Sequence, residues 1–201
     1  MKSIATRLFL GTVFLLMSST AFAGHPAADR VTDILEEAFR IVDMSGSAQK
    51  NAMCRFVSRY IDKNSIATQL LGRYNRSSDT NGVREFKREA GSQMVTKAFP
   101  KMSDMKGNSG SYSVSDRVTS KPGGKYSVSV TISTNKGKRY SGRAILNSSL
   151  DLLDVEYLGF SGVNYVARDI QNDISKYNRS STPVSDYMDA LKSSREFINC
   201  N

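Results

Sequence analysis

The stretch from Ser111 to Phe160 constrains the fold more than any other part of this 201-residue chain. Apolar and polar residues alternate through it in four runs, separated by short segments rich in Gly, Asn and Ser. Because successive side chains of a strand point to opposite faces, this period of two predicts four strands with one apolar and one polar face. The short turns favour an antiparallel meander. Its apolar members are Tyr112, Val114 and Val118; Tyr126, Val128, Val130 and Ile132; Tyr140, Gly142, Ala144 and Leu146; and Leu153, Val155 and Tyr157.

The chain before these runs repeats its apolar residues at helical spacing. Two helices are expected over 27–44 and from 47 to about 61. A short third helix has Asn64 or Ser65 as its N-cap and ends at Gly72. A single fourth helix follows the cap candidates at 77–79 and ends before Pro100, and a loop is expected over 102–110.

Two further helices are expected after the strands. One runs from Val163 to about Tyr177, and the last begins at Pro183 with Thr182 as its cap. The order of helices, then strands, then helices predicts an α+β fold in which helices cover one face of an antiparallel four-stranded sheet.

The first 23 residues have the pattern of a secretory signal peptide. Lys2 and Arg7 precede an apolar run, and Ala21-Phe22-Ala23 is a small-x-small cleavage signal, so the mature chain is expected to begin at Gly24. The alternative is a membrane anchor, but the apolar run is shorter than the about 20 residues that span a bilayer. The prediction is therefore a signal peptide over 1–23 and one exported domain over 24–201.

The mature chain is basic. Its net charge falls from +9 to +7 because Lys2 and Arg7 leave with the signal peptide. The basic residues are scattered and form no compact Lys/Arg block, which disfavours nucleic acid as a partner. An anionic membrane surface or an acidic protein fits this charge better, and a merely solvated basic surface is the alternative.

Two cysteines, Cys54 and Cys200, are present in the chain. In an oxidising compartment an even pair predicts a disulfide, and two residues allow one connectivity. Two buried free thiols are the alternative.

Residues that carry common catalytic chemistry are scarce. The one histidine, His25, lies next to the expected new N-terminus, so Ser-His-Asp and Cys-His sites are excluded. The sequence contains no CxxC, HExxH, phosphate-loop or GxGxxG motif. Asp151 and Asp154 are more typical of the polar side of a strand than of an acid–base pair. The sequence therefore predicts a binding protein without catalytic residues, metal or cofactor, and periodicity alone leaves open whether its apolar faces enclose a cavity or a solid core.

Two parts of the chain have patterns that belong together. The first comprises Phe56–Asp62, Ile66-Ala67 and Leu71–Tyr74, followed by Phe86, and the second is the run Asp154–Ser161. In these residues the chain resembles the MlaC family, also called toluene-tolerance auxiliary proteins. Members are periplasmic phospholipid carriers of ABC transport systems that maintain outer-membrane asymmetry. The resemblance implies an NTF2-like cone with a deep apolar pocket between sheet and helices, and no enzymatic activity.

The resemblance also implies partners and a ligand site. The expected partners are a phospholipid, an inner-membrane ABC transporter with its MCE-domain protein, and an outer-membrane lipoprotein complex, with the carrier a monomer. A carrier of hopanoid or another small apolar ligand, and an NTF2-like enzyme, are the alternatives. The side chains expected around the lipid are Leu70, Leu71, Tyr74, Phe86, Val128, Val130, Leu146, Val155, Tyr157 and Val163, and ordinary core packing is the competing role of each.

Overall fold

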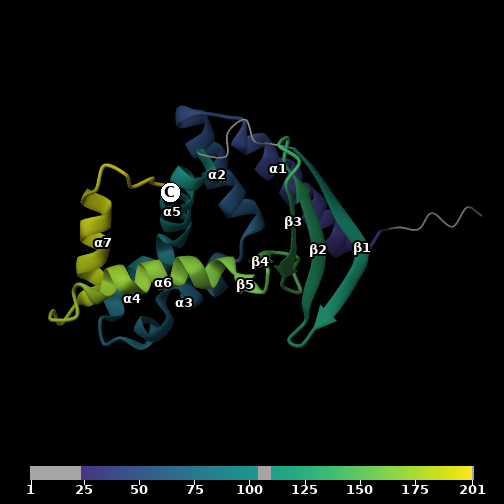
Figure 1. The fold of residues 1–201 in the computed structure, drawn as a ribbon. Helices are drawn as coiled ribbons and strands as arrows, with labels where there is room; N and C mark the ends of the chain where they lie inside the picture. The colour runs from purple at the N-terminus through teal and green to yellow at the C-terminus, as the bar shows by residue number, and fades with distance from the viewer. Residues whose placement is uncertain (1–23, 104–109, 201) are drawn as a thin grey trace, which may run out of the picture.

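A computed structural model describes residues 24–103 and 110–200, so the expected signal peptide over 1–23 lies outside it and stays a prediction. A sheet stands on one side and the helices extend away from it (Figure 1). The elements are α1 (Pro26–Val42), α2 (Gly46–Tyr60), α3 (Lys63–Leu71), the 3-10 turn η1 (Gly72–Arg76), α4 (Thr80–Arg88), α5 (Ala90–Ser103), β1 (Ser111–Lys121), β2 (Lys125–Ser133), β3 (Arg139–Leu146), β4 (Leu152–Tyr157), β5 (Phe160–Ser161), α6 (Gly162–Ser175) and α7 (Pro183–Ser193). The α+β class is confirmed.

The sheet is an antiparallel meander in the order β1-β2-β3-β4-β5. The expected number of four strands is wrong, because Phe160 and Ser161 form a fifth, two-residue strand paired with the end of β4. The reason is local: Leu158 and Gly159 both have positive φ, so the segment expected to be a break folds into a tight hairpin.

The apolar phase of β4 also differs from the expectation. Leu146 of β3 pairs with Leu152, and the preceding residue of β3, Ile145, pairs with Asp154, so Leu153 has no partner in β3. Such an extra residue shifts the alternation by one position. Leu152, rather than Leu153, therefore shares the inner face with Val155.

Helix α1 lies across the inner face of the sheet at β1 and β2 (Figure 1). Together they form the sheet cluster: Ala27, Ala28, Val31, Ile34, Tyr60, Val128, Val130, Ala144, Leu146 and Leu152. His25 caps α1, with its Nδ1 accepting a hydrogen bond from the Ala27 amide at 3.1 Å, and its ring lies 5.3 Å from that of Tyr126. The single histidine thus has a structural contact at the start of the fold.

Helices α3, α4, α6 and α7, with η1 and the start of α5, form a second core away from the sheet. This helical cluster contains Ile66, Ala67, Leu70, Leu71, Tyr74, Val83, Phe86, Ala90, Ala167, Ile170, Ile174, Val184, Tyr187 and Met188. Asp79 is the N-cap of α4. Its carboxylate accepts hydrogen bonds from the Gly82 amide at 2.9 Å and from the Ser185 amide of α7 at 2.7 Å. One side chain thus fixes the first turns of α4 and α7 together.

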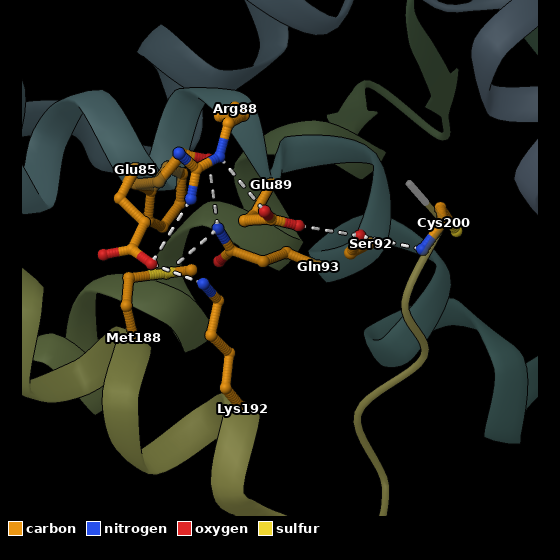
Figure 2. Close-up of polar contacts among 9 residues, drawn as sticks. Glu85, Arg88, Glu89, Ser92, Gln93, Met188, Lys192 and Cys200 are labelled. Atoms are coloured by element: carbon orange, nitrogen blue, oxygen red, sulfur yellow. Dashed lines mark hydrogen bonds and ion pairs between the residues drawn. The ribbon is translucent and has the colours of Figure 1, made fainter.

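The helix expected between 79 and 99 is two helices, α4 and α5, which break at Glu89. Side chains bond across the break: Gln93 donates to the Phe86 carbonyl at 3.3 Å, and the Ser92 hydroxyl donates to Glu89 at 3.2 Å (Figure 2). The first of these bonds satisfies the Phe86 carbonyl, a backbone group that a continuous helix would pair itself. The apolar stripe continues through the break, which explains why periodicity missed it.

The chain end is tied back to the helices. Cys54 of α2 and Cys200 form the predicted disulfide, with Cα atoms 5.2 Å apart. The Cys200 amide also donates to the Ser92 hydroxyl at 3.1 Å (Figure 2), and the Ile198 amide donates to Thr96 at 2.9 Å. Ile198 thereby joins the α2–α5 cluster, which contains Ile41, Ala52, Met53, Val57, Val95 and Ile198.

Candidate functional site

Two apolar hollows lie between the layers of the fold. The first is formed by α1, α2 and α5 and has a volume of about 220 Å³. The second is formed by α3, α5, β4 and the start of α6 and also has a volume of about 220 Å³. The first is lined by Ala38, Ile41, Met53, Phe56, Val57, Ile61, Met94 and Val95, and the second by Ile61, Ile66, Leu70, Met94, Leu152, Asp154, Val155, Gly162, Val163 and Val166.

The two hollows share two side chains, Ile61 and Met94. Ile61 packs against all three apolar clusters, and Met94 packs against the helical cluster and the α2–α5 cluster. Both are only partly buried, so they form a thin partition rather than a packed core. Methionine has three rotatable bonds and adapts its shape easily. The two hollows are therefore adjacent, and Ile61 and Met94 line both.

Polar contacts at Asp62 fix the position of the neighbouring Ile61. Asp62 caps α3, accepting a bond from the Ser65 amide at 3.0 Å, and it also accepts one from the Asn147 side chain at 3.1 Å. Its amide donates to the Leu152 carbonyl at 3.3 Å. The bonds from Ser65, with a smaller contribution from Asn147, hold the pKa of the Asp62 carboxyl below its usual value. The cap was expected at Asn64 or Ser65, and it lies earlier in the chain, at a residue that also joins the helix to the β3–β4 turn.

Asp154 is the one titratable side chain among the described residues that line the two hollows. One of its carboxylate oxygens accepts the amide of Val155 at 2.8 Å and the amide of Val163 at 3.0 Å. The carboxylate is thus engaged at the N-terminus of α6, where a negative charge is stabilised. No group of three or more His, Cys, Asp or Glu residues that could hold a metal ion occurs in 24–103 and 110–200.

Three of the side chains predicted to surround a lipid line the second hollow: Leu70, Val155 and Val163. The others lie elsewhere. Leu71, Tyr74 and Phe86 are buried in the helical cluster, and Val128, Val130 and Leu146 are buried in the sheet cluster. Tyr157 is 40% exposed at the end of the inner face of β4. A lipid contact for these seven residues stays a prediction.

Sequence reasoning missed the partition and the whole of the first hollow. Ile61, Met53 and Phe56 were recognised as one helical stripe, and Met94 as part of another, but a stripe does not say whether it meets a solid core or a gap. A signal was present in the two methionines, since this residue type is typical of adaptable apolar surfaces.

Comparisons with known proteins bear on this geometry through the fold. No protein-family model matches the sequence, and no curated protein matches it. Among solved structures, the chain is similar to the phospholipid-binding protein from Ralstonia solanacearum in complex with a phospholipid, with a TM-score of 0.56 and 11% sequence identity. The match covers 82% of this chain and 95% of that one. At this identity the likeness shows a shared fold across nearly the whole of the described protein.

Proposed function

We propose that this chain is a carrier that holds the acyl chains of a phospholipid in the two hollows and moves the lipid between the outer and inner membranes. The observation that supports this best is the pair of adjacent apolar hollows that share Ile61 and Met94 in their linings. Together they reach the size range of small-molecule pockets, roughly 300–1,000 Å³. The likeness in fold to a phospholipid-binding protein points to the same class of ligand.

A phospholipid does not cross an aqueous compartment unaided at a useful rate. Its two acyl chains contain about 30 methylenes, and each methylene costs about 0.8 kcal/mol on transfer to water. A hollow that matches the apolarity of the bilayer removes most of this barrier without any catalytic group. The engaged state of Asp154 fits such a passive role.

The place of action and the partners follow as parts of the same proposal. The signal-peptide pattern over 1–23 and the Cys54–Cys200 disulfide fit a periplasmic location. No helix in the described part of the chain is long and apolar enough to cross a membrane. The carrier would then be the soluble component of an ABC-type transport system, receiving or delivering lipid at an MCE-domain protein and an outer-membrane lipoprotein complex.

The test is organic extraction of protein purified from the periplasm, followed by lipid mass spectrometry. We expect phospholipid in the extract. In Val163→Trp the larger indole occupies space in the second hollow that the acyl chain would need, and we expect at least about tenfold less bound phospholipid, or about 1.4 kcal/mol of binding free energy. Asn164→Trp, at the exposed neighbouring position on α6, is the matched control and should keep its lipid.

Three results would contradict the proposal. One is an extract without any lipid, another is a hopanoid or other small apolar molecule in its place, and the third is equal phospholipid in Val163→Trp and Asn164→Trp with native circular dichroism.

A further inference from the structure

The turn between β4 and β5 exposes large apolar side chains. We call Tyr157, Leu158, Gly159 and Phe160 the β4–β5 tip; Leu158 is 73% and Phe160 is 77% exposed. Figure 1 places β5 where the sheet passes into α6. Exposed apolar residues gathered in one place on a protein surface usually mark an interaction site.

The backbone conformation of the tip is unusual for the large side chain that it exposes. Leu158 has a φ of 50°, and Gly159 has a φ of 81°. Two-residue turns with positive φ at both positions favour Asn, Asp or Gly, because a larger side chain is strained there. A largely exposed apolar side chain is thus held in the turn against the local backbone preference, and such departures cluster at functional sites.

Aromatic and basic side chains occur on the elements that flank the tip. The ring of Tyr157 lies 5.8 Å from that of Tyr140, and Arg168 lies 5.8 Å from the ring of exposed Tyr165. Three exposed arginines come from the flanking elements: Arg139 and Arg143 of β3 and Arg168 of α6. Arg143 lies 3.9 Å from Glu156, so that charge is partly compensated.

The tip is also continuous with the second hollow. Val155, two residues before Tyr157 on the same face of β4, is 52% exposed and lines that hollow. On the other side of the turn, Gly162 and Val163 follow β5 directly and line it as well. One apolar surface therefore runs from the tip into the hollow.

We propose that the β4–β5 tip inserts into the interfacial region of a bilayer containing anionic phospholipid, and so holds the second hollow at the membrane surface. The proposal rests on the proposed function, in that the hollow receives acyl chains. Tyrosines lie preferentially at headgroup level, and arginines are attracted to anionic lipids. An apolar chain passing along Val155 would then exchange one apolar surface for another without entering water.

A bilayer fits the tip better than a protein partner does. The strongest anchors of protein interfaces lie at the centre of a patch, enclosed by a rim that excludes water. Leu158 instead stands on a two-residue turn and Phe160 directly follows it, both largely exposed, while the rings of Tyr157 and Tyr140 pair on the strands behind the turn. This is the arrangement of a shallow wedge.

The first experiment is flotation of the mature protein with vesicles of phosphatidylcholine and phosphatidylglycerol in equal amounts. We expect binding to exceed that to phosphatidylcholine alone, and to weaken as salt rises to physiological levels, where the Debye length is about 8 Å. Leu158→Asn suits the turn, so it should fold normally, yet it should bind at least about tenfold more weakly, or about 1.4 kcal/mol. Leu150→Asn is the matched control, because Leu150 is the other leucine with positive φ, and it should bind like the native protein.

The second experiment uses the absence of tryptophan from the chain. Phe160→Trp makes the tip the only indole, and Phe197→Trp places the only indole on the C-terminal tail. On binding vesicles with brominated acyl chains, we expect a blue shift and quenching at position 160 and neither at position 197.

Three results would each overturn the proposal: bound Phe160→Trp protein whose indole is not quenched, equal binding by Leu158→Asn and the native chain, or no vesicle binding at all. The first two results would indicate that the tip binds a protein partner instead of the bilayer. Lipid extraction separates this failure from that of the proposed function. Protein that carries phospholipid but ignores vesicles contradicts the tip alone, and protein that binds vesicles through the tip but carries no phospholipid contradicts the carrier alone.

Discussion

Two aspartates, Asp62 and Asp79, each cap a helix and join it to a distant part of the chain. Asp62 links the start of α3 to Asn147 in the β3–β4 turn, and Asp79 links the start of α4 to Ser185 in α7. In both, one carboxylate satisfies donors from segments that are far apart in sequence. The relative placement of sheet, α3 and α7 therefore depends on single side chains.

Replacing Asp79 should destabilise the protein strongly. Asp79→Ala removes the cap of α4 and leaves the partly buried Ser185 amide without its acceptor, which we expect to lower the free energy of unfolding by about 2–4 kcal/mol. Chemical denaturation measures this change. The control is Asp189→Ala on the exposed side of α7, which should change it by less than about 0.5 kcal/mol. Equal effects of both substitutions would contradict the linking role of Asp79.

Stability should fall in acid. Burial alone would raise the pKa of Asp79, but bonds from Ser185 and Gly82 outweigh it and lower the pKa. The pKa of Asp173 is also lowered, because hydrogen bonds from Lys176 and Lys97 outweigh the effect of burial. The pKa of Asp62 is lowered as well. Since the folded pKa values lie below the unfolded value of about 3.9, the stabilisation is complete above that pH and is lost as pH falls through the folded values. Denaturation midpoints that stay constant from about pH 6 down to about pH 2 would contradict this.

At the scale of elements, sequence pattern predicted what local periodicity controls. The strands from Ser111 to Tyr157 and the helix starting at Pro183 were found, because each has a single period and turn residues at its ends. The break at Glu89, the unpaired Leu153 and the short strand at Phe160 were missed. In each case a few hydrogen bonds or one turn with positive φ determines the local structure. Neither of these features changes the apolar pattern of the sequence.

The hollows were beyond such reasoning for a further reason. Ile61 and Met94 come from different elements, and their adjacency depends on the Asp62 bonds and on how α5 packs. Leu70, Val155 and Val163 were predicted because they lie on faces that meet other elements. The same criterion selected Leu71 and Phe86, which pack into solid core. Periodicity identifies the apolar face but not the space in front of it.

The partition between the hollows should control the length of the ligand. Met94→Ala removes one of the two side chains that separate them, so we expect the extracted phospholipids to shift toward longer acyl chains by mass spectrometry. Met94→Leu conserves volume and should leave the distribution of chain lengths as in the native protein. Identical distributions in all three proteins would show that Met94 does not separate the hollows.

At the scale of the whole molecule, the disulfide closes most of the described chain, from α2 to the C-terminal tail, into one loop. Cys54 and Cys200 are 146 residues apart in sequence, and Ile198 beside the bond packs in one cluster with Met53, Val57 and Val95, which line the first hollow. The chain end therefore supports the wall of a hollow that is formed by distant, N-terminal parts of the sequence.

Reduction should lower the melting temperature. In the chain-entropy model a loop of this length contributes at most about 5 kcal/mol, so Cys54→Ser with Cys200→Ser should melt well below the native protein. Neither cysteine lines a hollow, so bound lipid should persist below the new melting temperature. Intact mass after thiol alkylation without reductant checks the bond itself, and two alkylated cysteines in freshly exported protein would contradict it.

In the proposed carrier, acyl chains lie in the two hollows that share Ile61 and Met94. Photocrosslinking with a phospholipid that carries a diazirine in its acyl chain, followed by peptide mass spectrometry, tests this directly. We predict adducts on the end of α2, on α5 around Met94 and on the first turns of α6. Adducts confined to the polar face of the sheet or to α7, or the absence of adducts in folded protein, would contradict it.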